Sequence, residues 1–314
     1  MQFIDLHRQY YVIEAKVNKR IQAILKHKHF IGGEDIAELE KRLAEYVGVK
    51  HVLACASGTD ALTIPMMAYG LKKTDAVFVP SFTFFASGES VSLAGGTPVF
   101  VDSCRETFNI DPKALEETIV KTLDEGKLEP KGIIAVDLFG LPADFDEIRR
   151  IADKYNLFVL EDAAQGFGGT IRGKRACSFG DVAGTSFFPA KPLGCYGDGG
   201  AIFTDSDELY EKMKSIHVHG QGTDKYDNIQ IGLNSRLDTI QAAVLIEKLN
   251  IFDNELVNRN RVAKYYTEQL KDIVETPTVP EGYGSSWAQF TLKLKSTEER
   301  EKLIKTLNDN GIPA

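Results

Sequence analysis

Cysteine and long apolar runs are both scarce in this chain of 314 residues. Its few cysteines form no Cys-x-x-Cys pair and lie far apart, at Cys55, Cys104, Cys177 and Cys195. The sequence therefore signals neither a disulfide framework nor a cysteine-based zinc site. No stretch approaches the run of about 18 apolar residues that a membrane-spanning helix needs, and residues 1–11 lack the apolar segment and cleavage site of a signal peptide. We expect a cytoplasmic protein without a membrane partner.

Positive charge is in the minority, with 37 lysines and arginines against 45 acidic residues and a net charge of −8. This balance gives no electrostatic reason to expect a nucleic-acid partner. The pairs His27/His29 and His217/His219 have no evident third ligand nearby, so we expect no metal site. Hydrophobic residues make up 43% and charged residues 26%, as in ordinary globular proteins.

Short apolar runs rich in β-branched and aromatic residues alternate with amphipathic segments from residue 34 to about residue 161. We predict strands at 51–55, 76–80, 98–101, 132–136 and 157–161, and helical segments at 34–46, 84–95, 112–124 and 144–155. This alternation is typical of a mostly parallel sheet covered by helices on both faces. In such sheets, functional groups gather where strands end at their carboxyl side.

The pattern changes after about residue 205. We expect a predominantly helical stretch to about residue 272, then a linker marked by prolines and glycines between 277 and 284, a strand at 287–294 and a helix at 297–309. We expect a large domain over residues 1–250, with an N-terminal helical arm, and a smaller α+β domain over 251–314. With one strand after the linker, the smaller domain looks incomplete at Ala314.

Lys191 has no charged neighbour within four residues on either side and stands among aromatic residues and glycines. Apolar surroundings disfavour an ammonium ion and lower the pKa of an amine below its usual value of about 10.4. A neutral amine can attack a carbonyl and form a Schiff base. The alternative is a lysine in a glycine-rich turn whose head reaches solvent.

Two further segments follow predicted strands. Asp162 directly follows the strand predicted at 157–161, at its carboxyl end, where a carboxylate can pair with a protonated pyridine nitrogen or cap the next helix. Ser57, Gly58 and Thr59 open a helical run, where backbone N–H groups can bind a phosphate or merely form an N-cap. Neither a Walker loop nor a complete dinucleotide fingerprint is present. An amine, an acid and an anion cradle are together what pyridoxal phosphate requires.

The chain also resembles the DegT/DnrJ/EryC1/StrS family of nucleotide-sugar aminotransferases from about residue 3 to its end. The matching segments occur in family order at Phe30–Glu34, Ser57–Leu62, Pro80–Phe84, Glu161–Gln165, Ser186–Gly200, Asn234–Asp238 and 241–243. The resemblance implies the α/β fold of fold-type-I pyridoxal-phosphate transferases. That fold has a mostly parallel seven-stranded sheet flanked by helices, and a smaller C-terminal α+β domain.

The resemblance also implies a role for each matching residue. Lys191 would hold the cofactor covalently and move a proton, and Asp162 would pair with the pyridine nitrogen. The other cofactor contacts would be Gln165 with the ring hydroxyl, Gly58, Thr59 and Ser186 with the phosphate, Phe84 stacked on the ring, and Asn234 with the phosphate of the neighbouring subunit. Shared active sites imply a homodimer. Without the resemblance, we would expect Phe84 to pack in the core and Asn234 to cap a helix.

The reaction implied is amino transfer from glutamate, which leaves as 2-oxoglutarate, to a keto group of a UDP- or dTDP-linked sugar in ping-pong fashion. Dehydratases of the family carry histidine at the position of Lys191, which argues against that branch. The segments most resemble members that act on a UDP-linked 3-oxo-glucuronate in surface-polysaccharide synthesis, such as that of lipopolysaccharide. Arg236 could bind a carboxylate or form an ion pair with Asp238 or another neighbour.

Three alternatives remain open at this stage. The substrate could be a 4-keto nucleotide sugar, since similar segments occur in enzymes for such sugars. The chain could be a non-catalytic regulatory protein that keeps the cofactor fold. It could also catalyse another pyridoxal-phosphate-dependent reaction, such as that of a lyase acting on amino acids.

Overall fold

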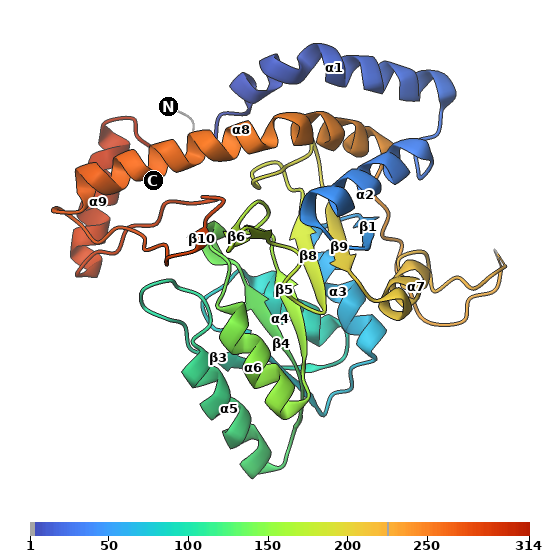
Figure 1. Ribbon diagram of the computed structural model, residues 1–314, viewed down its shortest axis with the longest axis horizontal. Coiled ribbons are helices and arrows are strands. Elements are labelled where there is room, and N and C mark those ends of the chain that lie inside the picture. Colours follow the sequence, from blue (N-terminus) through green and yellow to red (C-terminus); the bar gives the residue numbers. More distant parts are fainter. Residues whose placement is uncertain (1–3, 225) are drawn as a thin grey trace.

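A seven-stranded sheet lies at the centre of the computed structural model, which describes residues 4–224 and 226–314 (Figure 1). Its strands run in the order β1 (His51–Cys55), β9 (Gly200–Thr204), β8 (Val182–Ser186), β5 (Phe158–Asp162), β4 (Glu129–Val136), β2 (Asp75–Pro80) and β3 (Thr97–Val101). The strands from β8 to β3 are mutually parallel, and β9 is antiparallel to both its neighbours. The predicted mostly parallel sheet of seven strands is confirmed.

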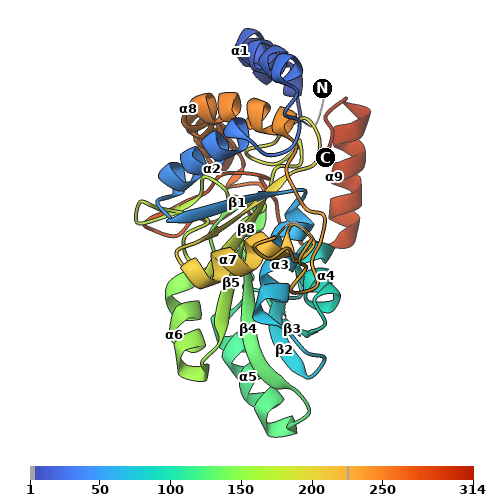
Figure 2. The ribbon, with the colours of Figure 1, turned by 90° about the vertical axis from the view of Figure 1, so that its right-hand side faces the viewer.

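Helices cover both faces of this sheet (Figure 2). One face carries α3 (Gly58–Tyr69), α4 (Phe85–Leu93) and α7 (Asp207–Ile216), and the other carries α2 (Glu34–Val47), α5 (Pro112–Glu125), α6 (Phe145–Tyr155) and part of α8 (Thr239–Leu270). Successive strand residues point to opposite faces. In β2, Val77 and Val79 pack with α3 and α4, whereas Ala76 and Phe78 pack with α5 and α6. Burial on both faces explains the continuous apolar runs in the strand sequences.

Helix α8 crosses the top of the sheet in Figure 1, and α1 (Leu6–His27) lies along it. Ile13 and Val17 of α1 pack against Val244 of α8. Helix α8 is continuous through residue 250, so the domain boundary expected there falls inside a helix. The division into two domains remains a prediction. No helix among the described residues is long and apolar enough to cross a membrane.

Helices α7 and α8 occupy most of the stretch from 205 to 272 that we expected to be predominantly helical, but the described residues between them, 217–224 and 226–238, are irregular. His219 and Gly220 have φ angles of 56° and 70°, which end the helical path. Gly232 lies against the backbone of Gly220 so closely that a Cβ would collide with it. This close approach brings the two ends of a loop together, of which residues 217–224 and 226–238 are described.

The C-terminal segment adds one strand, β10 (Tyr283–Gly284), to a second, three-stranded sheet. The order of this sheet is β10, β6 (Thr170–Ile171) and β7 (Lys174–Arg175), and β6 and β7 lie between β5 and β8 in the chain. Helix α9 (Thr297–Asp309) spans the predicted residues. The strand expected at 287–294 is wrong, since the only β pairing there is an isolated bridge between Lys293 and Glu275. Trp287 has a φ of 51°, and this left-handed conformation interrupts an extended path.

Candidate active site

A cavity of about 650 Å³ opens where β4, β5 and β8 reach their carboxyl ends. The last residues of these strands, Val136, Asp162 and Ser186, all line it. Its wall contains most of the predicted site residues, namely Gly58, Thr59, Phe84, Asp162, Gln165, Ser186 and Lys191. Asn234 and Arg236 are not part of the wall. The site therefore lies at the sheet edge expected for a parallel α/β fold.

Lys191 is held on the turn that follows β8. Its backbone N–H donates to the Phe188 carbonyl at 2.8 Å, and the Cys195 N–H donates to the Phe187 carbonyl at 2.7 Å. Burial lowers the pKa of Lys191, and the nearby Asp162 carboxylate opposes this effect. The lysine is partly buried in the cavity wall rather than extended into solvent. This environment favours the neutral amine that a nucleophile requires.

Helix α8 contacts the turn through three polar side chains. Gln241 Oε1 accepts the Tyr196 N–H at 2.8 Å, and Lys248 Nζ lies 4.5 Å from the centre of the Tyr196 ring. Arg259 Nη2 donates to the Pro192 carbonyl at 3.4 Å. Lys248 is only 1% exposed. The residues after Lys191 are thus attached to a rigid helix at three points.

Asp162 is the last residue of β5 and is almost fully buried. Burial raises its pKa, whereas hydrogen bonds from Ser87 Oγ at 2.7 Å and from the Ala164 N–H at 3.2 Å, with the charge of Lys191, lower it. No helix begins directly after Asp162, so the helix-cap alternative is wrong. A hydrogen-bonded carboxylate in a cavity can pair with a protonated ring nitrogen.

The anion cradle forms where α3 meets the end of β8. Ser57 is the N-cap of α3, and its Oγ accepts the Asp60 N–H at 3.1 Å. The N–H groups of Gly58 and Thr59 precede the first intrahelical hydrogen bond and so remain available to a ligand. Ser186 Oγ accepts the Phe188 N–H at 3.2 Å, which leaves its own hydrogen available to donate. Three donors thus meet at the helix N-terminus, as a phosphate requires.

Gln165 has a defined amide orientation. Its Oε1 accepts the Phe139 N–H at 2.6 Å, so its Nε2 is the group available to donate toward the cavity. The Gln165 carbonyl accepts the Ser286 hydroxyl at 2.7 Å. A fixed N–H donor is what a ring oxygen would need from this residue.

The structure does not support the alternative roles of three predicted site residues, namely core packing for Phe84, a helix cap for Asn234 and an ion pair with Asp238 for Arg236. Phe84 is 71% exposed at the cavity rim, so the core-packing alternative is wrong. Asp238 rather than Asn234 is the N-cap of α8. Arg236 donates to Asn234 Oδ1 from Nε at 3.1 Å and Nη2 at 2.6 Å, instead of forming an ion pair with Asp238. Asn234 and Arg236 thus form one unit outside this cavity.

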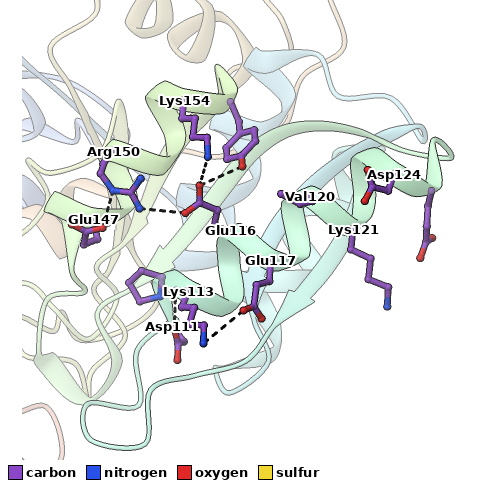
Figure 3. Close-up of a pocket in the computed structure, with 13 residues that line it drawn as sticks. Asp111, Lys113, Glu116, Glu117, Val120, Lys121, Asp124, Glu147, Arg150 and Lys154 are labelled. Carbon is purple, nitrogen blue, oxygen red and sulfur yellow. Dashed lines mark hydrogen bonds and ion pairs between the residues drawn. The ribbon is translucent and has the colours of Figure 1, made fainter.

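A larger hollow of about 1070 Å³ lies between α5 and α6 (Figure 3). It shares no residue with the Lys191 cavity. Several charges in its wall are paired with one another: Glu116 accepts from Lys154 at 2.7 Å and from Arg150 at 3.3 Å. Its lysines, at 113, 121 and 154, are exposed, and none of its carboxylates is buried as Asp162 is, so chemistry rather than size identifies the Lys191 cavity as the candidate site.

The donor set of this cavity fits a phosphorylated pyridine aldehyde. Lys191 supplies an amine whose pKa is lowered by burial, Asp162 a buried carboxylate, and the start of α3 an anion site. The position of Gly58 reinforces the fit, because a Cβ there would meet Ser186 and close the cradle. Among the described residues, no group of three histidine, cysteine or acidic residues is arranged to hold a metal ion.

Residues 12–314 match the profile of the DegT/DnrJ/EryC1/StrS aminotransferase family. The chain belongs to this family. A relative from Pseudomonas aeruginosa, a UDP-2-acetamido-2-deoxy-3-oxo-D-glucuronate aminotransferase, is 46% identical over all of this chain and 84% of its own length. The family that the sequence motifs indicated is therefore confirmed.

Solved structures of DegT/DnrJ/EryC1/StrS aminotransferases have the same fold. One from Brucella abortus has a TM-score of 0.97 and 50% identity, with coverage of 100% of this chain and 83% of that one. A Bacillus subtilis protein solved with bound cofactor PMP has a TM-score of 0.85 and 34% identity, over 94% of this chain and 66% of that one. The fold-type-I architecture predicted from sequence is confirmed.

Several residues of the wall were not found by sequence reasoning. Thr83 and Asp198 line the cavity, as do Ala288 and Gln289 from the C-terminal segment, and Ser87 lies directly behind Asp162. Thr83 lies within the matching segment Pro80–Phe84 and Ser87 follows it by three residues, so polar residues after a strand end were the available signal. Nothing in the sequence indicated that residues 288 and 289 fold back onto the cavity.

Proposed function

We propose that this chain is a pyridoxal-phosphate-dependent aminotransferase that transfers the amino group of glutamate to a keto group at C3 of a UDP-linked sugar. The observation that carries the proposal is the meeting of Lys191, Asp162 and the Gly58–Ser186 cradle in one cavity. The relative at 46% identity, which acts on a UDP-linked 3-oxo-glucuronate, supports this substrate class. The enzyme would work in the cytoplasm and supply an amino sugar for a surface polysaccharide such as lipopolysaccharide.

The predicted site residues in the wall each have a task in this proposal. Pyridoxal phosphate would supply the electron sink that lets the donor lose its α-proton. Lys191 Nζ would hold the aldehyde carbon, and after its release would move a proton at the donor carbon. The Asp162 carboxylate would stabilise a protonated ring nitrogen, and Gln165 Nε2 would donate to the ring oxygen. Phe84 would cover the ring face and exclude water.

The phosphate would bind the N–H groups of Gly58 and Thr59 and the Ser186 hydroxyl. These donors are fixed by the Ser57 cap and the Phe188 N–H, so little reorganisation accompanies binding. Glutamate would enter first and leave as 2-oxoglutarate, and the keto sugar would then occupy the same space. Sequential use of one cavity accounts for a ping-pong order.

We also propose a homodimer in which Asn234 and Arg236 complete the cavity of the partner subunit. Both residues lie outside the cavity of their own chain. Phe82, Phe84, Phe85 and Phe188, at or beside the cavity rim, are each at least 51% exposed. A cluster of exposed aromatic side chains is typical of a surface covered by another molecule. Arg236, oriented by Asn234, would then bind a carboxylate of the substrate.

A substrate panel tests the reaction. The purified enzyme, loaded with glutamate, is mixed with UDP- and dTDP-linked 3-keto and 4-keto sugars, and the products are identified by mass spectrometry. We expect amination of the UDP-linked 3-keto uronate. Amination of a 4-keto sugar alone would overturn the assignment of C3, and release of ammonia without sugar amination would overturn amino transfer.

Subunit complementation tests the dimer. Lys191→Ala and Asn234→Ala variants are purified separately, then unfolded and refolded together to form mixed dimers. Mixed dimers contain one cavity with both native residues, so activity should recover to about a quarter of wild type if subunits mix randomly. If the activity of the refolded mixture is no greater than the summed activities of the two separate variants, the proposal of shared active sites is contradicted.

A further inference from the structure

Two hydroxyl groups form a chain that ends at Asp162. Ser87 Oγ donates to Asp162 Oδ2 at 2.7 Å, and Thr83 Oγ1 lies 2.9 Å from Ser87 Oγ. Ser87 is fully buried in the first turn of α4, whereas Thr83 is partly exposed in the cavity wall. The chain thus runs from the cavity surface to the carboxylate behind it.

The direction of each hydrogen bond follows from the number of hydrogens. A serine hydroxyl has one hydrogen, and that of Ser87 is donated to Asp162. Thr83 must therefore be the donor in the contact between the two hydroxyls. Each donor polarises the next, which strengthens the final bond to the carboxylate.

We propose that Ser87, oriented by Thr83, is a positioning residue that fixes the Asp162 carboxylate toward the ring nitrogen of the cofactor. This inference rests on the proposed role of Asp162. The second oxygen of Asp162 accepts the Ala164 N–H, so the carboxylate is held at both oxygens. Rotation of the carboxylate would break one of these bonds, and an aligned anion is what pairing with a ring cation requires.

Ser90 shows that a buried serine on this helix need not have such a role. It is also fully buried on α4, but its hydroxyl donates to the Ser87 carbonyl at 3.1 Å, a bond within one helical turn. Removing this hydroxyl alters α4 packing to a similar extent without touching Asp162. Ser90→Ala is therefore the matched control.

The experiment compares Ser87→Ala, Ser87→Thr, Thr83→Val, Ser90→Ala and Asp162→Asn as full-length enzymes. Two readouts are taken besides the rate of the glutamate half-reaction. One is the dissociation constant of pyridoxal phosphate from titration of the apoprotein. The other is the pH midpoint of the absorbance change of the bound cofactor, which reports on its protonation.

Loss of a hydrogen bond to a charged group predicts about a tenfold weaker cofactor affinity in Ser87→Ala and a shift of the midpoint to lower pH. Thr83→Val should show a smaller change of the same sign, because Ser87 still reaches Asp162. Ser87→Thr keeps the hydroxyl and should restore the midpoint, while Ser90→Ala should leave it unchanged.

If Asp162→Asn abolishes the half-reaction, then equal dissociation constants and equal pH midpoints in Ser87→Ala and Ser90→Ala would overturn the proposal. If Asp162→Asn itself behaves like wild type, the proposed site is wrong and the positioning role falls with it. Should Ser87→Ala fail to fold, Thr83→Val decides, since its side chain lies at the cavity surface. A wild-type midpoint in Thr83→Val would then contradict the proposal.

Discussion

Gly58 and Ser186 lie so close together that a Cβ on residue 58 would come within 2.5 Å of the Ser186 Cβ. Their contact joins the start of α3 to the end of β8 and forms the proposed phosphate cradle. The φ angle of Gly58 is not in the left-handed region, so glycine is required here for space rather than for backbone conformation.

The substitution Gly58→Ala should force α3 and Ser186 apart and weaken cofactor binding by about tenfold or more, since the N–H donors would lose alignment. The measurement is titration of the apoprotein with pyridoxal phosphate. Gly173→Ala is the control: that glycine has a φ of 82° and open space around it, so alanine should lower thermal stability without changing cofactor affinity. Unchanged affinity in Gly58→Ala would contradict the cradle.

A buried carboxyl pair beneath the site predicts a pH dependence of folding stability. Asp137 and Glu161 are fully buried and close enough for each carboxyl to shift the pKa of the other, and Asp137 Oδ2 has no hydrogen-bond partner among the described residues. One of the two must therefore carry a proton. Burial raises the pKa of Asp137, and burial raises that of Glu161 to about 7. The folded protein thus binds more protons than the unfolded chain between the ordinary carboxyl pKa and pH 7.

The free energy of unfolding should consequently fall as pH rises through this window. Asp137→Asn replaces the shared proton with a permanent N–H donor and should raise stability at pH 8 by about 1 kcal/mol, while flattening the pH dependence. Urea unfolding between pH 5 and 8 measures both effects. Asp153→Asn, at an exposed side chain, serves as control. A profile for Asp137→Asn as steep as that of wild type would exclude the shared proton.

Buried Lys248 should make the free energy of unfolding depend on pH in the opposite direction. Burial lowers its pKa from 10.5 to about 8, partly opposed by the charge of Glu255. Between these values the unfolded chain binds more protons than the folded one, so the contribution of Lys248 to stability rises with pH. At pH 7 the charged form is buried in full and destabilises the fold.

Lys248→Met should therefore raise the free energy of unfolding at pH 7, by about 1 kcal/mol, and the difference from wild type should shrink toward pH 10. Urea unfolding at both pH values measures it. Lys264→Met, on the same helix with 79% of its side chain exposed, should change little at either pH. A destabilised Lys248→Met at pH 7 would mean that the contact with the Tyr196 ring outweighs desolvation.

The strands and the site were predictable where local pattern decides the outcome. Apolar runs placed β1, β2 and β3 to within one residue, and the same reasoning put Asp162 at a strand end. The strand expected at 287–294 failed because the left-handed conformation of Trp287 is imposed by its surroundings and leaves no mark in apolar spacing. The contact of Ser87 with Asp162 joins residues 75 positions apart, so it follows only from the fold.

The most direct test of the account is the release of 2-oxoglutarate from glutamate in a single turnover by Lys191→Ala, measured beside the wild-type enzyme by rapid mixing. Lys191 is the proposed nucleophile and proton carrier, so the variant should be slower by at least about a thousandfold while still folding and binding the cofactor. Release of 2-oxoglutarate at the wild-type rate by Lys191→Ala would contradict the proposed mechanism.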